Sequence, residues 1–134
     1  MNKGAFIHRV QALTGITDRN AAERATSVVL ETLCGRITHD EAQDLEAQLP
    51  EGIDTMCRGS VLKDMVSKVK GPDRLDREAF IEKIAHRAKL QNVQAAEQVT
   101  SAVFKTVKEQ ITEGEAQDVA DQLPKRLKIM WLES

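Results

Sequence analysis

The chain has 134 residues, of which 41% are hydrophobic and 30% charged, and its formal net charge at pH 7 is −2. This balance indicates a globular domain with one core, and it excludes the strongly basic field that recruits nucleic acid or anionic membranes. Three phenylalanines, one tryptophan and no tyrosine also disfavour single-strand binding by base stacking.

One segment of the chain occurs twice, at a constant spacing of 74 residues and without gaps. The block Glu41–Asp44 returns as Glu115–Asp118, and Gln48–Pro50 returns as Gln122–Pro124. A duplicated supersecondary unit usually cannot bury its apolar face alone. We therefore expect the two copies to pack together.

Apolar residues follow a helical period in both copies. The first copy opens on a short stripe, Phe6, Ile7, Val10 and Leu13 or Thr14, followed by a longer one, Ala21, Ala25, Val28, Val29, Thr32, Leu33 and Ile37. The second copy repeats both, with Phe80, Ile81, Ile84 and Ala88, then Ala95, Val99, Ala102, Val103, Thr106, Val107 and Ile111. No window alternates as a strand would, so the sequence predicts an all-α fold.

The limits of the helices follow from capping residues. Side chains that accept a hydrogen bond from a free backbone amide stand at matching positions before the first three helices of each copy: Asn2 and Asp76, Asp18 and Asn92, Thr38 and Thr112. Glu41 and Glu115 would complete a capping box with the two threonines. Pro50 and Pro124 end the third helix and can open a short fourth one, over about 51–58 and 125–132.

A connecting segment separates the copies. Its apolar residues predict an amphipathic turn or two that Gly71-Pro72 ends: Val61, Leu62, Met65, Val66 and Val69, with Lys63, Lys68 and Lys70 facing water. We expect a first helical repeat over 1–59, a connecting helix and linker over 60–75, and a second repeat over 76–134. The predicted architecture is two tandem three- to four-helix units in one bundle-like domain, with pseudo-two-fold symmetry and a core shared along the long second helices.

The two cysteines, Cys34 and Cys57, are relevant to the cellular compartment in which the protein is expected. No apolar run is long enough for a signal-peptide core or a membrane span, so a reducing cytoplasm is expected. A bridge between the cysteines is conceivable, but free thiols are the expectation. Their counterparts in the second copy are Lys108 and Trp131, so no framework common to both copies depends on a disulfide.

The repeated blocks carry a family resemblance. Each copy has a Phe-Ile opening, an Ala-Ala-Glu segment, a Glu-Ala-Gln-Asp block and a Gln-Leu-Pro before a short helix, and the chain ends in Lys125–Trp131. From about residue 5 to 132 it resembles the DUF2267 family, bacterial helical proteins of unknown function. The resemblance implies a helical fold, a bacterial origin and a cytoplasmic address, and it brings no catalytic or binding residues. The acidic, glycine-containing segment 50–54 departs from its basic counterpart, so the two copies would not bind a ligand equally.

Polar residues kept in both copies are the candidates for chemistry. Carboxylates at Glu23 and Glu97, with Asp44 and Asp118, could serve as acid and base, but helix-start and solvated positions explain them better. The Thr26-Ser27 and Thr100-Ser101 pairs lack a repeated histidine, since His8, His39 and His86 are not equivalent, and back-bonding to a carbonyl accounts for such hydroxyls. Cys34, His39 and Cys57 lack the spacing of a zinc site. The sequence predicts no catalytic residue, cofactor or metal.

The last predicted helix combines basic residues with an aromatic one. Lys125, Arg126, Lys128 and Trp131 are candidate contacts for a protein partner, whereas in the alternative interpretation Leu127, Met130 and Trp131 only seal the second copy. The leading hypothesis is a non-enzymatic cytoplasmic interaction or regulatory protein that binds another protein or forms a homodimer. The alternatives are a small-ligand carrier with an apolar pocket between the copies, and a weak nucleic-acid binder.

Overall fold

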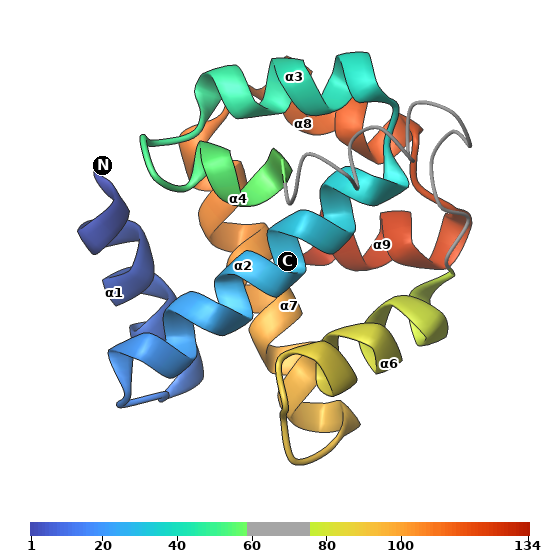
Figure 1. Ribbon diagram of the computed structural model, residues 1–134. Coiled ribbons are helices and arrows are strands. Elements are labelled where there is room, and N and C mark those ends of the chain that lie inside the picture. The colour runs from blue at the N-terminus through green and yellow to red at the C-terminus, as the bar shows by residue number, and fades with distance from the viewer. Residues whose placement is uncertain (59–75) are drawn as a thin grey trace.

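The structure, a computed structural model, describes residues 1–58 and 76–134. The first copy forms α1 (Lys3–Thr14), α2 (Arg19–Arg36), α3 (His39–Gln48) and α4 (Asp54–Arg58); the second forms α6 (Arg77–Arg87), α7 (Val93–Gln110), α8 (Glu113–Asp121) and α9 (Lys125–Glu133). All regular structure in these two ranges is helical, which confirms the all-α prediction (Figure 1). None of the described helices combines the length and apolarity needed to cross a bilayer. The predicted connecting helix lies outside the described residues.

The predicted capping side chains are present at the starts of all six helices for which one was predicted. Each side chain accepts a hydrogen bond from an amide two or three residues on: Asn2 from Ala5, Asp18 from Asn20 and Ala21, Thr38 from Glu41, Asp76 from Ala79, Asn92 from Ala95, and Thr112 from Glu115. Amides in the first turn of a helix have no partner within the helix, so these acceptors fix where each helix begins. Capping chemistry was therefore readable from the sequence.

The fourth helices differ between the copies. In the second copy α9 begins at Lys125, directly after Pro124, as predicted. In the first copy the expected start at residue 51 is wrong, and α4 begins only at Asp54. Gly52 explains the delay, because its φ of 91° is a left-handed conformation that cannot continue a helix. A Cβ added there would lie 2.8 Å from Lys3 Cδ, so the flexible Lys3 side chain would also have to shift.

One cluster of buried side chains includes residues of both copies. Helix α1 packs on α7, α6 packs on α2, and α2 crosses α7 at the centre of the molecule (Figure 1). Ion pairs also join the two copies: Arg9 pairs with Glu109 at 3.0 Å, and Arg87 pairs with Glu31 at 3.1 Å. The two copies thus share a core, as expected. The pseudo-two-fold symmetry and the domain limits stay predictions.

Two glutamines cross between the copies where α3 lies beside α8 (Figure 1). The amide of Thr38 donates to Gln122 Oε1 at 2.7 Å, and the amide of Thr112 donates to Gln48 Oε1 at 2.9 Å. The capping-box prediction was therefore right for the threonine hydroxyls and wrong for the glutamates. A glutamine from the opposite copy reaches each amide that Glu41 or Glu115 was expected to bind.

Removing either crossing glutamine is expected to destabilise the protein modestly. Gln48→Ala or Gln122→Ala each removes one hydrogen bond between the copies, which is worth about 0.5–1.5 kcal/mol. Urea denaturation of the two single variants and the double variant measures the effect. Gln43→Ala is the matched control, since among the described residues Gln43 bonds to His39 of its own helix and to no residue of the second copy. Equal losses in Q43A and Q122A would contradict a role for the crossing bonds in joining the copies.

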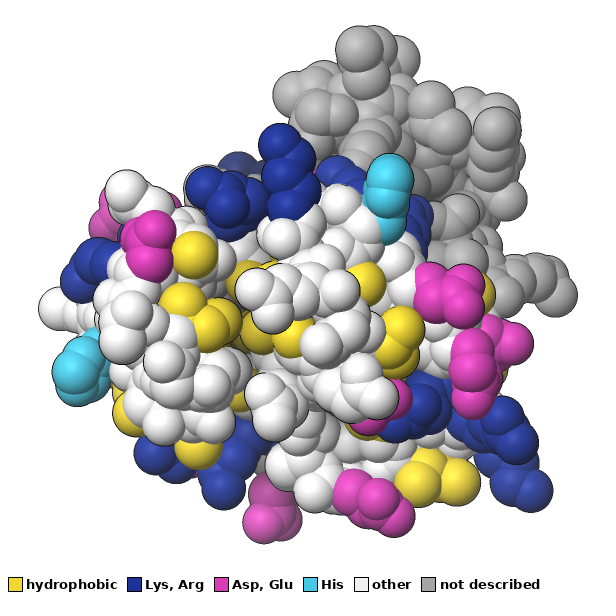
Figure 2. Space-filling view, turned by 90° about the horizontal axis from the view of Figure 1, so that it is seen from below, with side chains coloured by type: hydrophobic (Ala, Val, Ile, Leu, Met, Phe, Trp, Pro, Cys, Tyr) yellow, Lys and Arg dark blue, Asp and Glu magenta, His cyan; other side chains and the backbone are white. Residues whose placement is uncertain are grey.

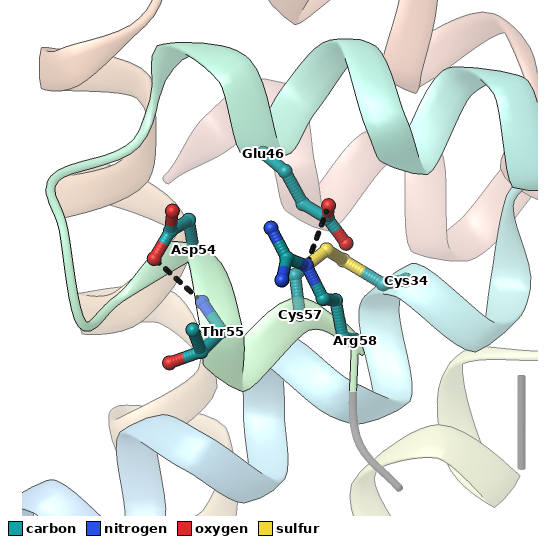
Figure 3. Close-up of a disulfide and its surroundings, with 6 residues drawn as sticks. All are labelled: Cys34, Glu46, Asp54, Thr55, Cys57 and Arg58. Atoms are coloured by element: carbon teal, nitrogen blue, oxygen red, sulfur yellow. Dashed lines mark hydrogen bonds and ion pairs between the residues drawn. A yellow bond between two sulfur atoms is a disulfide. The ribbon is translucent and has the colours of Figure 1, made fainter. Parts of the chain in front are cut away.

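Cys34 of α2 and Cys57 of α4 form a disulfide, with their Cα atoms 5.5 Å apart (Figure 3). The expectation of free thiols is thus wrong for this structure. Packing of α2 against α4 brings together two cysteines that are 23 residues apart, a proximity that the spacing alone does not reveal. The ion pair between Arg58 Nε and Glu46 Oε2, at 3.2 Å, lies beside the bridge (Figure 3).

The equivalent positions of the second copy are also in contact. Lys108 Nζ donates to the carbonyl oxygen of Trp131 at 2.6 Å and lies 5.8 Å from the centroid of its ring. Burial, with a smaller contribution from the charge of Lys105, lowers the pKa of Lys108. The second helix is therefore tied to the fourth at the same two positions in each copy, by a disulfide in one and an ammonium group in the other.

Candidate functional site

The four residues predicted to bind a partner lie on α9, but they do not share one face. Trp131 is completely buried, its indole N–H donates to the carbonyl oxygen of Ala116 at 3.0 Å, and its ring meets Phe104 edge-on with 5.1 Å between centroids. Leu127 beside it is also buried. The indole therefore belongs to the core of the second copy, and its surface is closed to a partner in this conformation.

The three basic residues are at or near the surface. Arg126 Nη1 pairs with Glu78 Oε1 at 2.9 Å, and Lys128 Nζ lies 3.6 Å from a carboxylate oxygen of Asp121. Lys125 is exposed and forms no ion pair with the described residues. Surface pairs of this kind contribute little to stability, so Arg126 and Lys128 can exchange their partners at low cost.

Exposed apolar side chains lie on the same helix. Ile129 is 44% exposed and Leu132 53%, three residues apart, and Lys125 precedes Ile129 by one turn. We call Lys125, Arg126, Ile129 and Leu132 the α9 outer face. The counterparts of Ile129 and Leu132 in the first copy are the polar Thr55 and Arg58. These two apolar residues were not among the predicted contacts, although the difference between the copies is visible in the sequence.

A second candidate site, which the sequence analysis also missed, lies where α3 meets α8. Glu41 and Glu115 are each only 7% exposed, and Glu41 Oε1 and Glu115 Oε2 have no hydrogen-bond partner among the described residues. One carboxylate oxygen from each of Glu41, Glu115 and the exposed Asp118 can be chosen so that all lie within 4.8 Å of one another. We call these three residues the carboxylate cluster.

The pKa of Glu41 in the carboxylate cluster is higher than that of an ordinary glutamate. Burial, together with a hydrogen bond to Glu115 and the negative charges of Glu115, Asp118 and Asp44, raises the pKa of Glu41 to about 8. A carboxyl group with this pKa keeps its proton at neutral pH. Without a bound cation, Glu41 therefore holds its proton at pH 7 and can donate it in the hydrogen bond to Glu115.

The stability of the metal-free protein is expected to fall as the pH rises. Because the pKa of Glu41 is higher in the folded state, its contribution is complete below the unfolded value of about 4.5 and is lost as the pH rises through about 8. The slope is at most about 1.4 kcal/mol per pH unit for one proton. Urea denaturation in a chelating buffer between these values measures it.

Glu41→Gln is expected to remove this pH dependence, because an amide does not titrate. Glu113→Gln is the control, since Glu113 is an exposed residue in the first turn of α8 and lies outside the cluster. A wild-type protein whose stability varies with pH no more than that of E41Q would contradict the raised pKa of Glu41.

The other candidates from the sequence are placed in structural roles. Glu23 pairs with Lys3 at 2.6 Å, and Glu97 pairs with Arg77 at 3.5 Å, at equivalent positions of the two copies. Asp44 is exposed, as expected of a solvated face. These carboxylates therefore act in surface pairs or face solvent, apart from Asp118 in the cluster.

The structure also places the hydroxyl, histidine and cysteine candidates. Thr26 Oγ1 donates to the carbonyl oxygen of Ala22 at 2.7 Å, the predicted back-bond, whereas the buried Thr100 Oγ1 has no partner among the described residues. The three histidines are exposed, and His39 contacts Gln43. The disulfide occupies both cysteine sulfurs, so a site of Cys34, His39 and Cys57 is not formed.

The fold and these two sites define a small all-helical protein with a shared core and a buried acidic contact between its copies. The chain belongs to the DUF2267 family: a family model described as "Uncharacterized conserved protein (DUF2267)" matches residues 3–130. The resemblance seen in the repeated blocks is confirmed. A comparison with curated proteins gives no match.

Proposed function

We propose that this protein is a non-enzymatic helical interaction protein and that it binds an acidic protein partner through the α9 outer face. The observation that carries the proposal is the exposure of Ile129 and Leu132 beside Lys125 on a helix whose other side is anchored in the core by Leu127 and Trp131. Apolar residues next to cations on a rigid helix suit a partner that presents apolar and acidic side chains.

The difference between the two copies supports a single binding face. Helix α4 is shorter than α9 and has Thr55 and Arg58 at the equivalent positions, so the first copy offers no comparable apolar pair. Contacts that cross between the copies hold α9 on a common body, since α9 packs on α7 and α7 packs on α1 and α2. A partner would therefore meet a preformed surface and lose little free energy to ordering it.

Affinity purification under lysine-reactive crosslinking tests the proposal. The baits are the wild-type chain, the Ile129→Ser/Leu132→Ser variant, and the control Thr55→Ala/Arg58→Ala. The expected result is one stoichiometric acidic partner with the wild type and the control, crosslinked to Lys125 or Lys128 and lost from I129S/L132S. Retention of the same partner by I129S/L132S, or no stoichiometric partner with any bait, would contradict the proposal. Circular dichroism checks that each variant is folded.

Other occupants of this face give different results in the same series. A homodimer would appear in sedimentation of the wild type alone. Nucleic acid would be retarded by the protein at low salt.

Figure 2 shows one face of the molecule, seen from below, where Lys and Arg side chains alternate with Asp and Glu around the edge and apolar atoms form small separate areas. This mixed charge pattern gives the surface seen in Figure 2 little attraction to a phosphate backbone. The small-ligand carrier stays a prediction, and ligand-dependent thermal stabilisation would test it.

We keep the bacterial cytoplasm as the proposed address. The Cys34–Cys57 disulfide argues against it, because thiols in the cytoplasm are normally kept reduced. Thiol trapping in intact cells decides the question: two alkylated cysteines would support a cytoplasmic protein, and two protected cysteines would favour an oxidising compartment.

A further inference from the structure

We propose that Glu41, Glu115 and Asp118 bind one divalent cation of the kind that prefers oxygen ligands, in a site that bridges α3 and α8. The proposal rests on the placement of the three carboxylates, on the buried oxygens of the two glutamates, which no described residue outside the cluster contacts as a donor, and on the absence of an ion pair to these three residues within the described structure. It is independent of the interaction proposed for α9.

The distances fit a small oxygen-lined site. One ligand atom from each residue can lie within 4.8 Å of the other two. Around Ca²⁺, with ligands at about 2.4 Å, two oxygens on opposite sides are about 4.8 Å apart, and around Mg²⁺ they are about 4.2 Å apart. Neighbouring ligands are closer still. Three carboxylates at such separations can therefore meet on one ion with small side-chain adjustments.

The burial of the two glutamates needs compensation. Each is only 7% exposed, and each has one buried carboxylate oxygen that receives no hydrogen bond from any described residue outside the cluster. Ionising both carboxylates in such surroundings is costly unless a cation satisfies them, so a bound cation would replace the proton that Glu41 otherwise holds. The ion pairs formed among the described residues do not include Glu41, Glu115 or Asp118.

The crossing glutamines explain why the glutamate oxygens accept no capping hydrogen bond. In a capping box the glutamate carboxylate would accept the amide of the threonine three residues earlier. Here Gln122 and Gln48 accept those amides instead, from Thr38 and Thr112. Both glutamates are thereby released from capping and directed toward the contact between α3 and α8, where a cation would join the two copies.

The donor set selects the class of ion. Carboxylate oxygens suit Mg²⁺, Ca²⁺ and Mn²⁺, whereas zinc and copper sites usually include imidazole or thiolate ligands. Asp118 is exposed, so an ion can enter from solvent on its side and keep water molecules in the remaining coordination positions. The expected site is thus one of moderate affinity that opens to solvent at Asp118.

Calorimetric titration of the chelator-treated full chain with Mn²⁺, Ca²⁺ and Mg²⁺ tests the site, with a thermal-shift series beside it. We expect one ion per chain for at least one of the three metals and a transition temperature that rises with its concentration. Asp118→Asn is expected to weaken binding at least tenfold, and Glu41→Gln/Glu115→Gln to abolish it. Because Asp118 is exposed, D118N tests the site even where the double variant does not fold.

Glu113→Gln is the control, because it removes one negative charge from the same turn of α8 outside the cluster. It is expected to leave binding within about twofold of the wild type, because Glu113 is exposed and solvent weakens its interaction with a bound ion. No binding of any of the three ions at about 1 mM, the weak end of protein calcium sites, would overturn the proposal. Equal weakening in E113Q and D118N would overturn it as well, since it would indicate a diffuse acidic surface.

Discussion

Trp131→Ala is expected to lower the free energy of unfolding by about 3–5 kcal/mol. The side chain is completely buried, and it contacts Phe104 through its ring and Ala116 through its indole N–H. Truncation leaves a cavity between α7, α8 and α9 and removes the only aromatic contact that α9 makes in the described structure. Urea denaturation followed by circular dichroism measures the loss.

Two matched variants separate the loss of buried volume from the loss of the indole hydrogen bond. Trp131→Phe keeps most of the buried volume and removes the N–H donor, so a smaller loss of about 1–2 kcal/mol is expected. Ile129→Ala changes an exposed residue two positions away and should cost less than about 1 kcal/mol. A loss in W131A no larger than that in I129A would show that Trp131 is not part of the core. This prediction also warns against alanine at Trp131 as a probe of partner binding, because the variant would lose stability first.

Reduction of the Cys34–Cys57 disulfide is expected to lower the free energy of unfolding by about 3 kcal/mol. The bridge closes a loop whose ends are 23 residues apart, and the chain-entropy relation gives this magnitude for a loop of that length. Urea denaturation with and without reductant measures the difference. The Cys34→Ser/Cys57→Ser variant should be destabilised and should no longer respond to reductant. An oxidised wild type that unfolds at the same urea concentration as the reduced one would contradict the prediction.

Local chemistry in the sequence predicted the helices well. The helical period identified the buried stripes, although at the start of the second helices the buried residues are Ala22 and Ala96, one position after the predicted Ala21 and Ala95. Caps and prolines gave most helix limits because a hydrogen bond to the next turn and a blocked backbone are local effects. Among the described helices, α4 begins later than predicted because Gly52 adopts a left-handed conformation.

Contacts between the copies were beyond the sequence pattern. A capping box and a crossing glutamine satisfy the same amide of Thr38, and a motif read along one helix cannot choose between them. The buried pair of Glu41 and Glu115 depends on that choice. The disulfide was missed for a related reason: the absence of cysteine at Lys108 and Trp131 hid the fact that both position pairs are contacts. Comparing paired positions between the copies would have been more informative than comparing residue types.

The interleaving of the two copies has a consequence for synthesis on the ribosome. Since α1 packs on α7 and α6 packs on α2, the first copy leaves the exit tunnel before the helices that cover it exist. Its apolar faces stay uncovered while the second half is translated, for roughly 4–15 seconds at about 5–20 residues per second. During that interval the nascent chain is a substrate for chaperones and for the same faces of neighbouring nascent chains, and native packing is completed only after the last helix emerges.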